Sequence, residues 1–136
     1  MRKITDIVVH ASATPKGQYF DIHDIRKWHL ARNFNDVGYH YVVLLDGTIQ
    51  IGRQLEVPGA HVKGYNRNSI GICYIGGGIP TKWEDTRTNA QKVALVYLIG
   101  KLKRTFRGAR VFGHRDYAGV KKACPCFDAM NEYKNI

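Results

Sequence analysis

The chain has 136 residues, of which 44% are hydrophobic and 24% charged, and its formal net charge is +10 with six histidines counted as neutral. This length suits one domain, so we expect a single domain over residues 1–136, and the composition is that of a folded globular protein. No apolar stretch approaches the roughly 20 residues of a membrane helix. With only three cysteines, we do not expect a scaffold that is stabilised by disulfides.

The first half of the chain predicts a strand, a helix and a hairpin. Their ranges are residues 4–10, 21–33, 38–45 and 48–52. The helix prediction rests on Asp21 as N-cap with Asp24 three positions later, and its apolar stripe continues through Ile22 and Ile25 to Trp28 or His29. The hairpin prediction rests on the pair Asp46-Gly47, which favours a tight turn. A long loop over residues 53–67 follows.

The second half predicts a strand over residues 69–75, a helix that starts near Thr88 and ends at Gly108, a strand over residues 110–113, and a short helix among the last dozen residues. Gln91 completes a capping box with Thr88. Strands that alternate with helices, together with one hairpin, indicate an α+β fold of three layers (α/β/α). A central mixed β-sheet containing the hairpin would be flanked by helices.

The positive charge is unevenly distributed. Residues 69–136 contain twelve Lys or Arg and five Asp or Glu, and residues 101–110 contain five basic residues and no acidic one. Such a surface attracts polyanions in general, including nucleic acid and the anionic polymers of a bacterial envelope. A solvated helix face that only keeps the protein soluble is the alternative.

Two histidines follow apolar strands directly, since His10 ends the first strand and His114 comes after the strand at residues 110–113. Strand ends are a common place for ligands in α/β sheets. Two histidines and a nearby thiol are ligand types that zinc takes, and three protein ligands leave a fourth position for water. The alternative is a nucleophilic Cys124 with His114 as its base, which leaves His10 without a role. Cys73 stands in an apolar run and is expected to be a buried hydrophobe.

Five short segments occur in order along nearly the whole chain. They are Val9-His10-Ala-Ser-Ala-Thr14, Asp36-Val-Gly-Tyr-His-Tyr41, Gly59-Ala-His-Val-Lys-Gly-Tyr-Asn66 with Asn68-Ser-Ile-Gly71, Gly113-His-Arg-Asp116, and Lys122-Ala-Cys-Pro125. Together they resemble the type-2 N-acetylmuramoyl-L-alanine amidases, which include the small lysozyme-named amidases of podoviruses and are related to peptidoglycan recognition proteins.

The resemblance implies a zinc hydrolase that cuts the amide between N-acetylmuramic acid and the L-alanine of the stem peptide. It implies one zinc ion held by His10, His114 and Cys124, and it implies catalytic roles for Tyr39 and Lys122. Without the resemblance, Tyr39 would be read as a packed strand tyrosine and Lys122 as a surface lysine.

The resemblance also implies that the loop over residues 59–68 lines the substrate groove. The substrate-binding candidates there are His61, Lys63, Tyr65 and Asn66. Asn66 has the alternative of shaping a turn. His40 should point away from Tyr39 by strand alternation and is expected to be structural.

The sequence departs from the family pattern at two places. The gap between His114 and Cys124 is slightly longer than in the phage proteins, which puts the placement of Lys122 in question. Cys126 stands where the family has a small or polar residue and competes with Cys124 as a ligand. Because Pro125 follows Cys124 as in the family, Cys124 is the preferred ligand.

The implied partner is bacterial peptidoglycan or its soluble muropeptides. We expect a monomeric catalytic domain, with no specific nucleic-acid partner and no insertion into a membrane. The first residues show no apolar signal segment, so the expected route is synthesis in the cytoplasm and release by a holin, by lysis or otherwise, as for a phage or prophage endolysin. One alternative is a non-catalytic peptidoglycan recognition module, and another is a nucleic-acid-binding protein that uses its basic helix.

Overall fold

The computed structural model describes residues 1–136 and contains one five-stranded sheet with the strand order β3-β2-β4-β1-β5. The strands are β1 (Asp6–Ala11), β2 (Tyr41–Val43), β3 (Ile49–Ile51), β4 (Ser69–Tyr74) and β5 (Arg110–Gly113). β1 pairs in parallel with both β4 and β5, β2 is parallel to β4, and only the β2–β3 hairpin is antiparallel. The sheet is therefore mixed and contains one hairpin, as the sequence predicted, and the structure places that hairpin at one edge.

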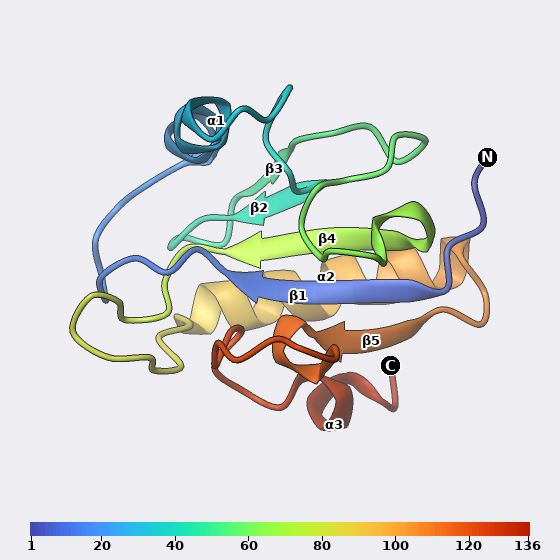
Figure 1. The fold of residues 1–136 in the computed structure, drawn as a ribbon. Coiled ribbons are helices and arrows are strands. Elements are labelled where there is room, and N and C mark those ends of the chain that lie inside the picture. The colour runs from blue at the N-terminus through green and yellow to red at the C-terminus, as the bar shows by residue number, and fades with distance from the viewer.

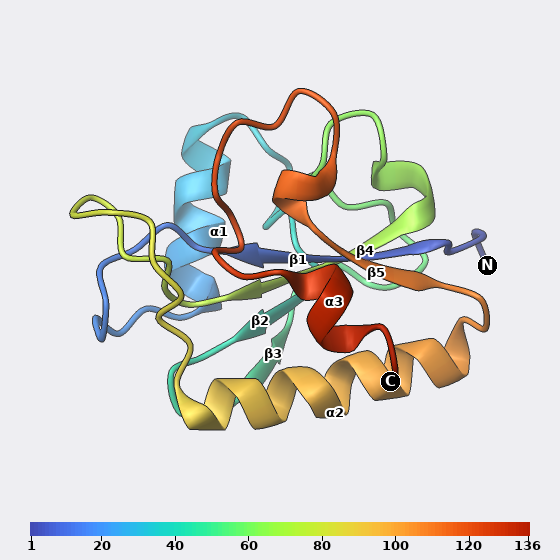
Figure 2. The same cartoon turned by 90° about the horizontal axis from the view of Figure 1, so that it is seen from below.

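Helices cover both faces of this sheet (Figures 1 and 2). They are α1 (Ile22–Ala31), α2 (Asn89–Thr105) and α3 (Ala129–Tyr133), with two short 3-10 turns at Asn66–Asn68 and His114–Asp116. In Figure 2, α2 and α3 lie below the sheet, whereas α1 and the two loops that contain the 3-10 turns lie above it. The predicted three-layer α/β/α architecture is confirmed.

Strand alternation divides the core between the two faces. On the lower face, Ile7 and Val9 of β1 pack in one apolar cluster with Leu95 and Leu98 of α2. The upper face has a smaller cluster, in which Ile25 of α1 packs with residues of β2 and β4. Each face buries its own apolar set, so β1 and β4 are covered on both sides and contain few polar residues.

Both long helices start at the predicted caps. The Asp21 carboxylate accepts hydrogen bonds from the backbone of His23 and Asp24, and Thr88 forms a capping box with Gln91. α1 places its last turn against the sheet through His29, which is 7% exposed, whereas Trp28 is 37% exposed. The open alternative for the helix stripe is thus resolved in favour of His29, and Trp28 is left at the surface.

A buried arginine fastens the segment before α2 to α3. The Arg87 side chain is 3% exposed and pairs with Asp85 at 2.9 Å and with Glu132 at 2.7 Å. Its guanidinium also lies 3.3 Å from the centre of the Phe127 ring. Because a buried arginine without partners would be costly, this network holds the chain around residues 80–87 against the C-terminal helix.

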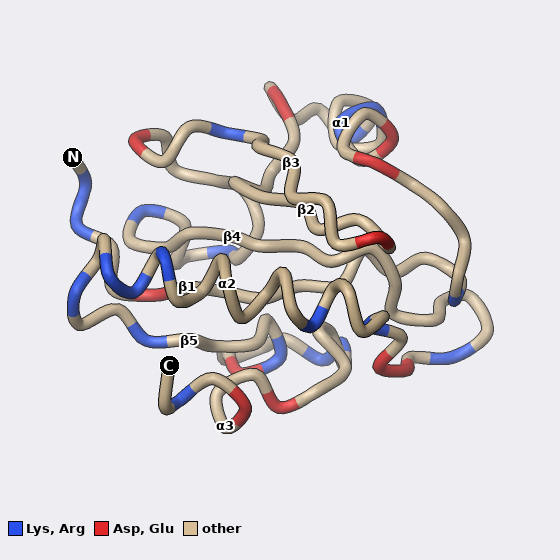
Figure 3. Tube along the Cα trace, turned by 180° about the vertical axis from the view of Figure 1, so that it is seen from behind, with Lys and Arg blue, Asp and Glu red and all other residues tan.

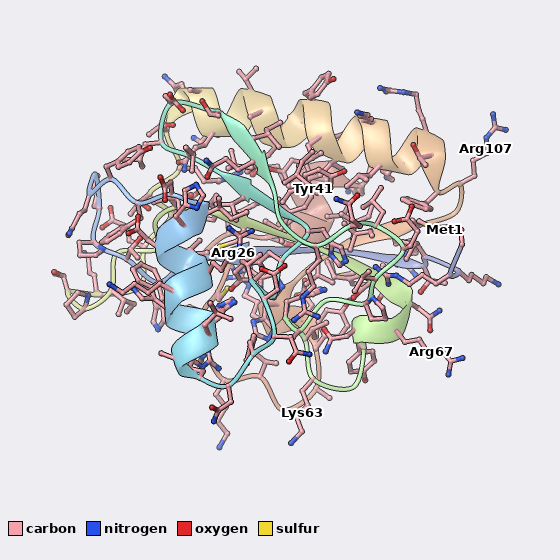
Figure 4. The ribbon with its side chains drawn as sticks, turned by 90° about the horizontal axis from the view of Figure 1, so that it is seen from above. Met1, Arg26, Tyr41, Lys63, Arg67 and Arg107 are labelled. Carbon is pink, nitrogen blue, oxygen red and sulfur yellow. The ribbon has the colours of Figure 1, made fainter.

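Lys and Arg lie densely around the N-terminus and the C-terminal part of α2 (Figure 3). In Figure 4, Met1, Arg67 and Arg107 lie together at this end, where the parallel strands begin. None of the helices is both long and apolar enough to cross a lipid bilayer.

Candidate functional site

A groove of about 500 Å³ opens on the α1 face, where β1 ends. Its lining comes from α1, from the chain before β2, from the loop after β3 and from the loop after β5. The lining residues include His10, Trp28, His29, Arg32, Phe34, Tyr39, His61, Lys63, Asn66, Trp83, His114, Lys122 and Cys124. The sheet edge therefore gathers most of the candidate residues in one place.

The parallel pairing of β1 with β5 brings the two strand-end histidines together. Val9 lies opposite Gly113 in this ladder, so the next residues, His10 near the end of β1 and His114 just after β5, lie at the same edge of the sheet. Their ring centroids are 4.6 Å apart. The ligand atoms of His10, His114 and Cys124 all lie within 4.8 Å of one another.

The loop after β5 returns Cys124 to the end of β1. The backbone N–H of Ala11 donates to the Cys124 Sγ at 3.1 Å, and the N–H of Arg115 donates to the Cys124 carbonyl at 2.8 Å. The hydroxyl of Tyr74 donates to the carbonyl of Pro125 at 2.7 Å. Despite the longer gap after His114, the thiol is fixed from both sides.

The thiol of Cys126, the alternative ligand, lies apart from the two histidines. Cys126 is outside the three-residue group, and its Sγ lies 3.8 Å from the Gly77 carbonyl oxygen. Cys73 is completely buried, as expected for a small hydrophobe. Among the three thiols, only Cys124 approaches the two histidines.

Burial controls the protonation of the three clustered side chains. It lowers the pKa of His10 well below 6.5, with neighbouring His61, His114 and Lys122 acting in the same direction. Burial also lowers the pKa of His114, helped by Lys122, and it raises the pKa of Cys124 to about 12. Two neutral imidazoles and one cysteine, whose thiol proton a zinc ion would displace, are donors that suit zinc, and three protein donors leave a position for water or substrate.

Tyr39 lies beside this group, just before β2. Its ring centroid is 5.0 Å from that of His10 and 5.4 Å from that of His29. Tyr39 and His40 precede β2, which begins at Tyr41, and the ring centroids of both lie near that of His61, at 6.4 and 6.0 Å.

His40 makes structural contacts. Its Nδ1 accepts from the Gly71 backbone N–H at 3.0 Å, and its Nε2 lies 2.8 Å from the Val57 carbonyl oxygen and 3.0 Å from the Arg2 guanidinium. Lys122 is exposed and lines the groove.

The loop predicted to bind substrate divides into lining and supporting residues. His61 lines the groove and its Nδ1 lies 2.8 Å from the His10 Nε2, while Lys63 is exposed at the rim and projects away from α2 (Figure 4). Asn66 also lines the groove, but its Oδ1 accepts from the backbone N–H groups of His61 and Val62, both at 2.9 Å. Asn66 therefore shapes this turn.

Tyr65 is outside the set of residues that line the groove, so its predicted contact with substrate stays a prediction. Its ring centroid lies 4.7 Å from that of Tyr117. The Tyr117 hydroxyl donates to the Asp6 carboxylate at 2.6 Å. The two tyrosines thus connect the loop before β4 with the loop after β5.

Several lining residues were missed by the sequence analysis. Arg32 and Phe34 come from the end of α1, and Trp83 comes from the segment before α2. A helix end and an irregular segment have no periodic pattern, so only their positions relative to the sheet edge show that they belong to the groove.

Comparison with known proteins agrees with this geometry. A family model described as N-acetylmuramoyl-L-alanine amidase matches residues 1–127. The chain belongs to this amidase family. The endolysin of Escherichia phage T7 is 42% identical over 129 residues, which cover 93% of this chain and 84% of the phage protein. The endolysin of Klebsiella phage KP32 is 41% identical over 131 residues, with 93% and 83% covered.

Solved structures show the same fold. The amidase LysC from Clostridium intestinale superposes with a TM-score of 0.80 at 24% identity, covering 96% of this chain and 82% of LysC. Drosophila PGRP-LB superposes with a TM-score of 0.79 at 26% identity, covering 99% and 82%. The family resemblance, the enzyme class and the fold class predicted from the sequence are all confirmed.

Proposed function

We propose that this family member is a zinc-dependent endolysin that cleaves the amide between N-acetylmuramic acid and the L-alanine of the peptidoglycan stem peptide. The observation that supports the zinc site is the convergence of His10, His114 and Cys124, whose ligand atoms lie within 4.8 Å of one another in a groove. The phage relatives support the endolysin role. Residues 1–136 would act as a single catalytic domain on peptidoglycan or muropeptides.

The three ligands would hold one zinc ion, with the His61 ring against His10 limiting the freedom of that imidazole. A zinc ion there would supply Lewis-acid polarisation of the amide carbonyl and a nucleophilic water at neutral pH. The Lys122 ammonium is proposed to stabilise the negative charge that develops on the carbonyl oxygen. The Tyr39 phenol, protonated at neutral pH, is proposed to deliver a proton towards the leaving amine.

The remaining lining residues would position the substrate. Lys63 at the rim is proposed to contact the substrate directly, and His61 is proposed to contact it from the floor of the groove. Asn66 would act through the turn that presents both of them. We propose that the protein works as a monomer and reaches the wall after release from the producing cell.

Digestion of purified peptidoglycan tests the reaction. We expect new free amino groups of L-alanine and no new reducing sugar ends, and we expect a chelator to stop the digestion. New reducing ends, or no products at all, would contradict the amidase proposal, and undiminished activity in chelator would contradict the zinc proposal.

The two cysteines near residue 125 provide a matched test of the ligand set. We expect Cys124→Ala to lose stoichiometric zinc in metal analysis, because only this thiol approaches the histidines. Cys126→Ala should retain zinc, since its thiol faces Gly77. The reverse pattern would assign the ligand to Cys126.

A further inference from the structure

The outer face of α2 exposes apolar side chains along its middle. Val93 is 71% exposed, Val96 50% and Tyr97 60%. At about 3.6 residues per turn these positions lie on one side of the helix. The opposite side contains Leu95 and Leu98, which pack against the sheet. Contiguous exposed apolar surface of this kind is typical of a site that another molecule covers.

The apolar surface continues sideways onto the edge strand. A shallow hollow lies between β3 and α2, and its lining includes Ile49, Val93 and Tyr97. Asp46 is the one acidic residue of the hollow, and its carboxylate already accepts from the Thr48 backbone N–H at 2.9 Å. The patch therefore spans a helix and a neighbouring strand, which makes it broad and shallow.

Cations border this patch on α2. The helix contains no Asp or Glu, and its exposed cations are Lys92, Lys101 and Arg104. By the helical repeat, Lys92 and Lys101 lie at the two edges of the apolar stripe, and Arg104 continues the stripe beyond Tyr97. None of the three cations takes part in an ion pair of the structure. The α2 tube in Figure 3 accordingly has blue and tan segments and no red one.

An apolar stripe with cations at its edges favours one class of ligand. Nucleic acid or another hydrated polyanion would neutralise the charges but would leave Val93 and Tyr97 in water. The surface of an anionic bilayer satisfies both, because apolar side chains enter the boundary between headgroups and acyl chains while lysines reach the phosphates beside them. A tyrosine suits this boundary, since its ring is apolar and its hydroxyl polar.

The position of the patch is compatible with the proposed activity. α2 lies below the sheet, whereas the groove opens on the α1 face above it (Figure 2). A protein that lies on a membrane through α2 would therefore keep its groove directed away from the lipid and open to a polymer.

We propose that the outer face of α2 docks on the surface of a bilayer that contains anionic lipid. Val93, Val96 and Tyr97 enter the headgroup boundary, and Lys92, Lys101 and Arg104 contact lipid phosphates. No segment crosses the bilayer in this arrangement. The inference goes beyond the amidase function, and binding measurements test it without any hydrolysis.

Co-sedimentation with lipid vesicles tests the docking. We expect the protein to bind vesicles of equal parts phosphatidylglycerol and phosphatidylcholine at least about tenfold more tightly than vesicles of phosphatidylcholine alone, because several cations face the lipid. Tyr97→Trp locates the contact. Brominated acyl chains should quench the additional emission of this variant, whereas Trp28 and Trp83 line the groove on the other face and should be quenched little.

Two exposed apolar residues distinguish a membrane from a soluble polyanion. Val93→Ser combined with Tyr97→Ser should weaken binding to the mixed vesicles at least about tenfold, because the apolar contact is lost. The same double variant should bind polyphosphate as the wild type does. Leu30→Ser, at a position that is 48% exposed on α1, is the matched control and should leave both affinities unchanged.

A matched pair of lysines tests the electrostatic part. Lys101→Gln should weaken binding to the mixed vesicles about fivefold, as for one lysine near an anionic surface. Lys27→Gln removes the same charge from the exposed side of α1 and should leave vesicle binding unchanged. Both variants should hydrolyse soluble muropeptides at the wild-type rate, since neither lysine lines the groove.

Equal binding to the two kinds of vesicle would overturn the proposal. Vesicle binding that Val93→Ser with Tyr97→Ser does not weaken would also overturn it, because the surface would then be a general polyanion site. Vesicle binding without quenching of Tyr97→Trp would assign the contact to another face. Failure of the amidase function is distinguishable, because the wild-type protein would then bind the mixed vesicles and digest no peptidoglycan.

Discussion

At the residue scale, five histidines in and beneath the groove are held uncharged at neutral pH. They are His10, His29, His40, His61 and His114. Burial is the first cause of the lowered pKa in each case, and nearby positive charges add to it. Neutral imidazoles keep a lone pair for a metal or a hydrogen bond. The positive charge of the groove therefore comes from Arg32, Lys63 and Lys122.

Substitution of the two proposed catalytic residues should separate chemistry from metal binding. We expect Tyr39→Phe and Lys122→Ala each to lower kcat by about 10²–10³-fold, the size of a lost proton donor or oxyanion contact. Zinc content should stay at the wild-type level, because neither side chain belongs to the group of three ligands. Steady-state kinetics with metal analysis of the same samples checks this, and unchanged kcat would remove the residue from the catalytic set.

At the element scale, β4 supports the groove through a glycine, which leaves room for the ring of a loop residue. Gly71 lies under the His61 ring, and a Cβ added there would come within 2.6 Å of the His61 Cγ. The ring is thereby able to lie on the strand and reach His10. A small residue on a central strand thus determines how a loop residue meets a proposed metal ligand.

We therefore predict that Gly71→Ala displaces His61, lowers peptidoglycan hydrolysis and destabilises the fold by about 1–3 kcal/mol, the usual cost of overpacking. Gly100→Ala on α2 is the matched control. A Cβ there meets only the flexible ends of Arg104 and Ile136, at 3.4 and 3.6 Å. This variant should gain about 0.5–1 kcal/mol from helix propensity and keep full activity. Urea unfolding and an activity assay check both, and equal effects of the two substitutions would contradict the steric argument.

At the scale of the whole molecule, stability should decrease as the pH falls. Burial is the main cause that lowers the pKa of both His29 and His40 from 6.5 to about 4. Between these pH values the unfolded chain binds more protons than the folded chain. The stabilisation that comes from the two neutral histidines is therefore complete above pH 6.5, and the free energy of unfolding decreases as the pH falls towards 4. Each group contributes on the order of 2–3 kcal/mol to this loss.

Urea unfolding of metal-free protein at a series of pH values measures the effect. His40→Gln should make the dependence on pH shallower, because one of the buried titrating groups is gone. His23→Gln, on the exposed side of α1, is the control and should leave the dependence as it is. A dependence that His40→Gln does not change would show that His40 is not a source of the loss.

The net charge of +10 should also act at the scale of the whole molecule. We predict that binding of metal-free protein to intact sacculi weakens strongly between low and high salt, because an anionic envelope attracts a cationic protein through a screened interaction. The double variant Arg104→Glu, Arg107→Glu should bind more weakly at low salt and show less salt dependence. Binding that is insensitive to salt would remove this role for the charge.

The sequence by itself determined the local elements and the residue types of the site. Asp21 and Thr88 mark their helix starts because capping is a local interaction, and the Asp46-Gly47 turn predicts its hairpin for the same reason. The predicted β2 was too long: residues 38–45 are rich in Tyr, Val and Leu, but only Tyr41–Val43 form the strand. The strand propensity of the residues does not show where backbone pairing with the neighbouring strand ends.

Only the tertiary structure decided which of these residues meet. The convergence of His10 and His114 depends on the parallel pairing of β1 with β5, which is a long-range contact that no local pattern encodes. The sequence already favours Cys124 over Cys126 because Pro125 follows it, and the structure adds that the Cys124 thiol lies near both histidines and faces the Ala11 backbone N–H. Only the structure shows that Arg32 lines the groove, where the turn after α1 places its guanidinium over Phe34. The sequence around a surface arginine is the same wherever its side chain points.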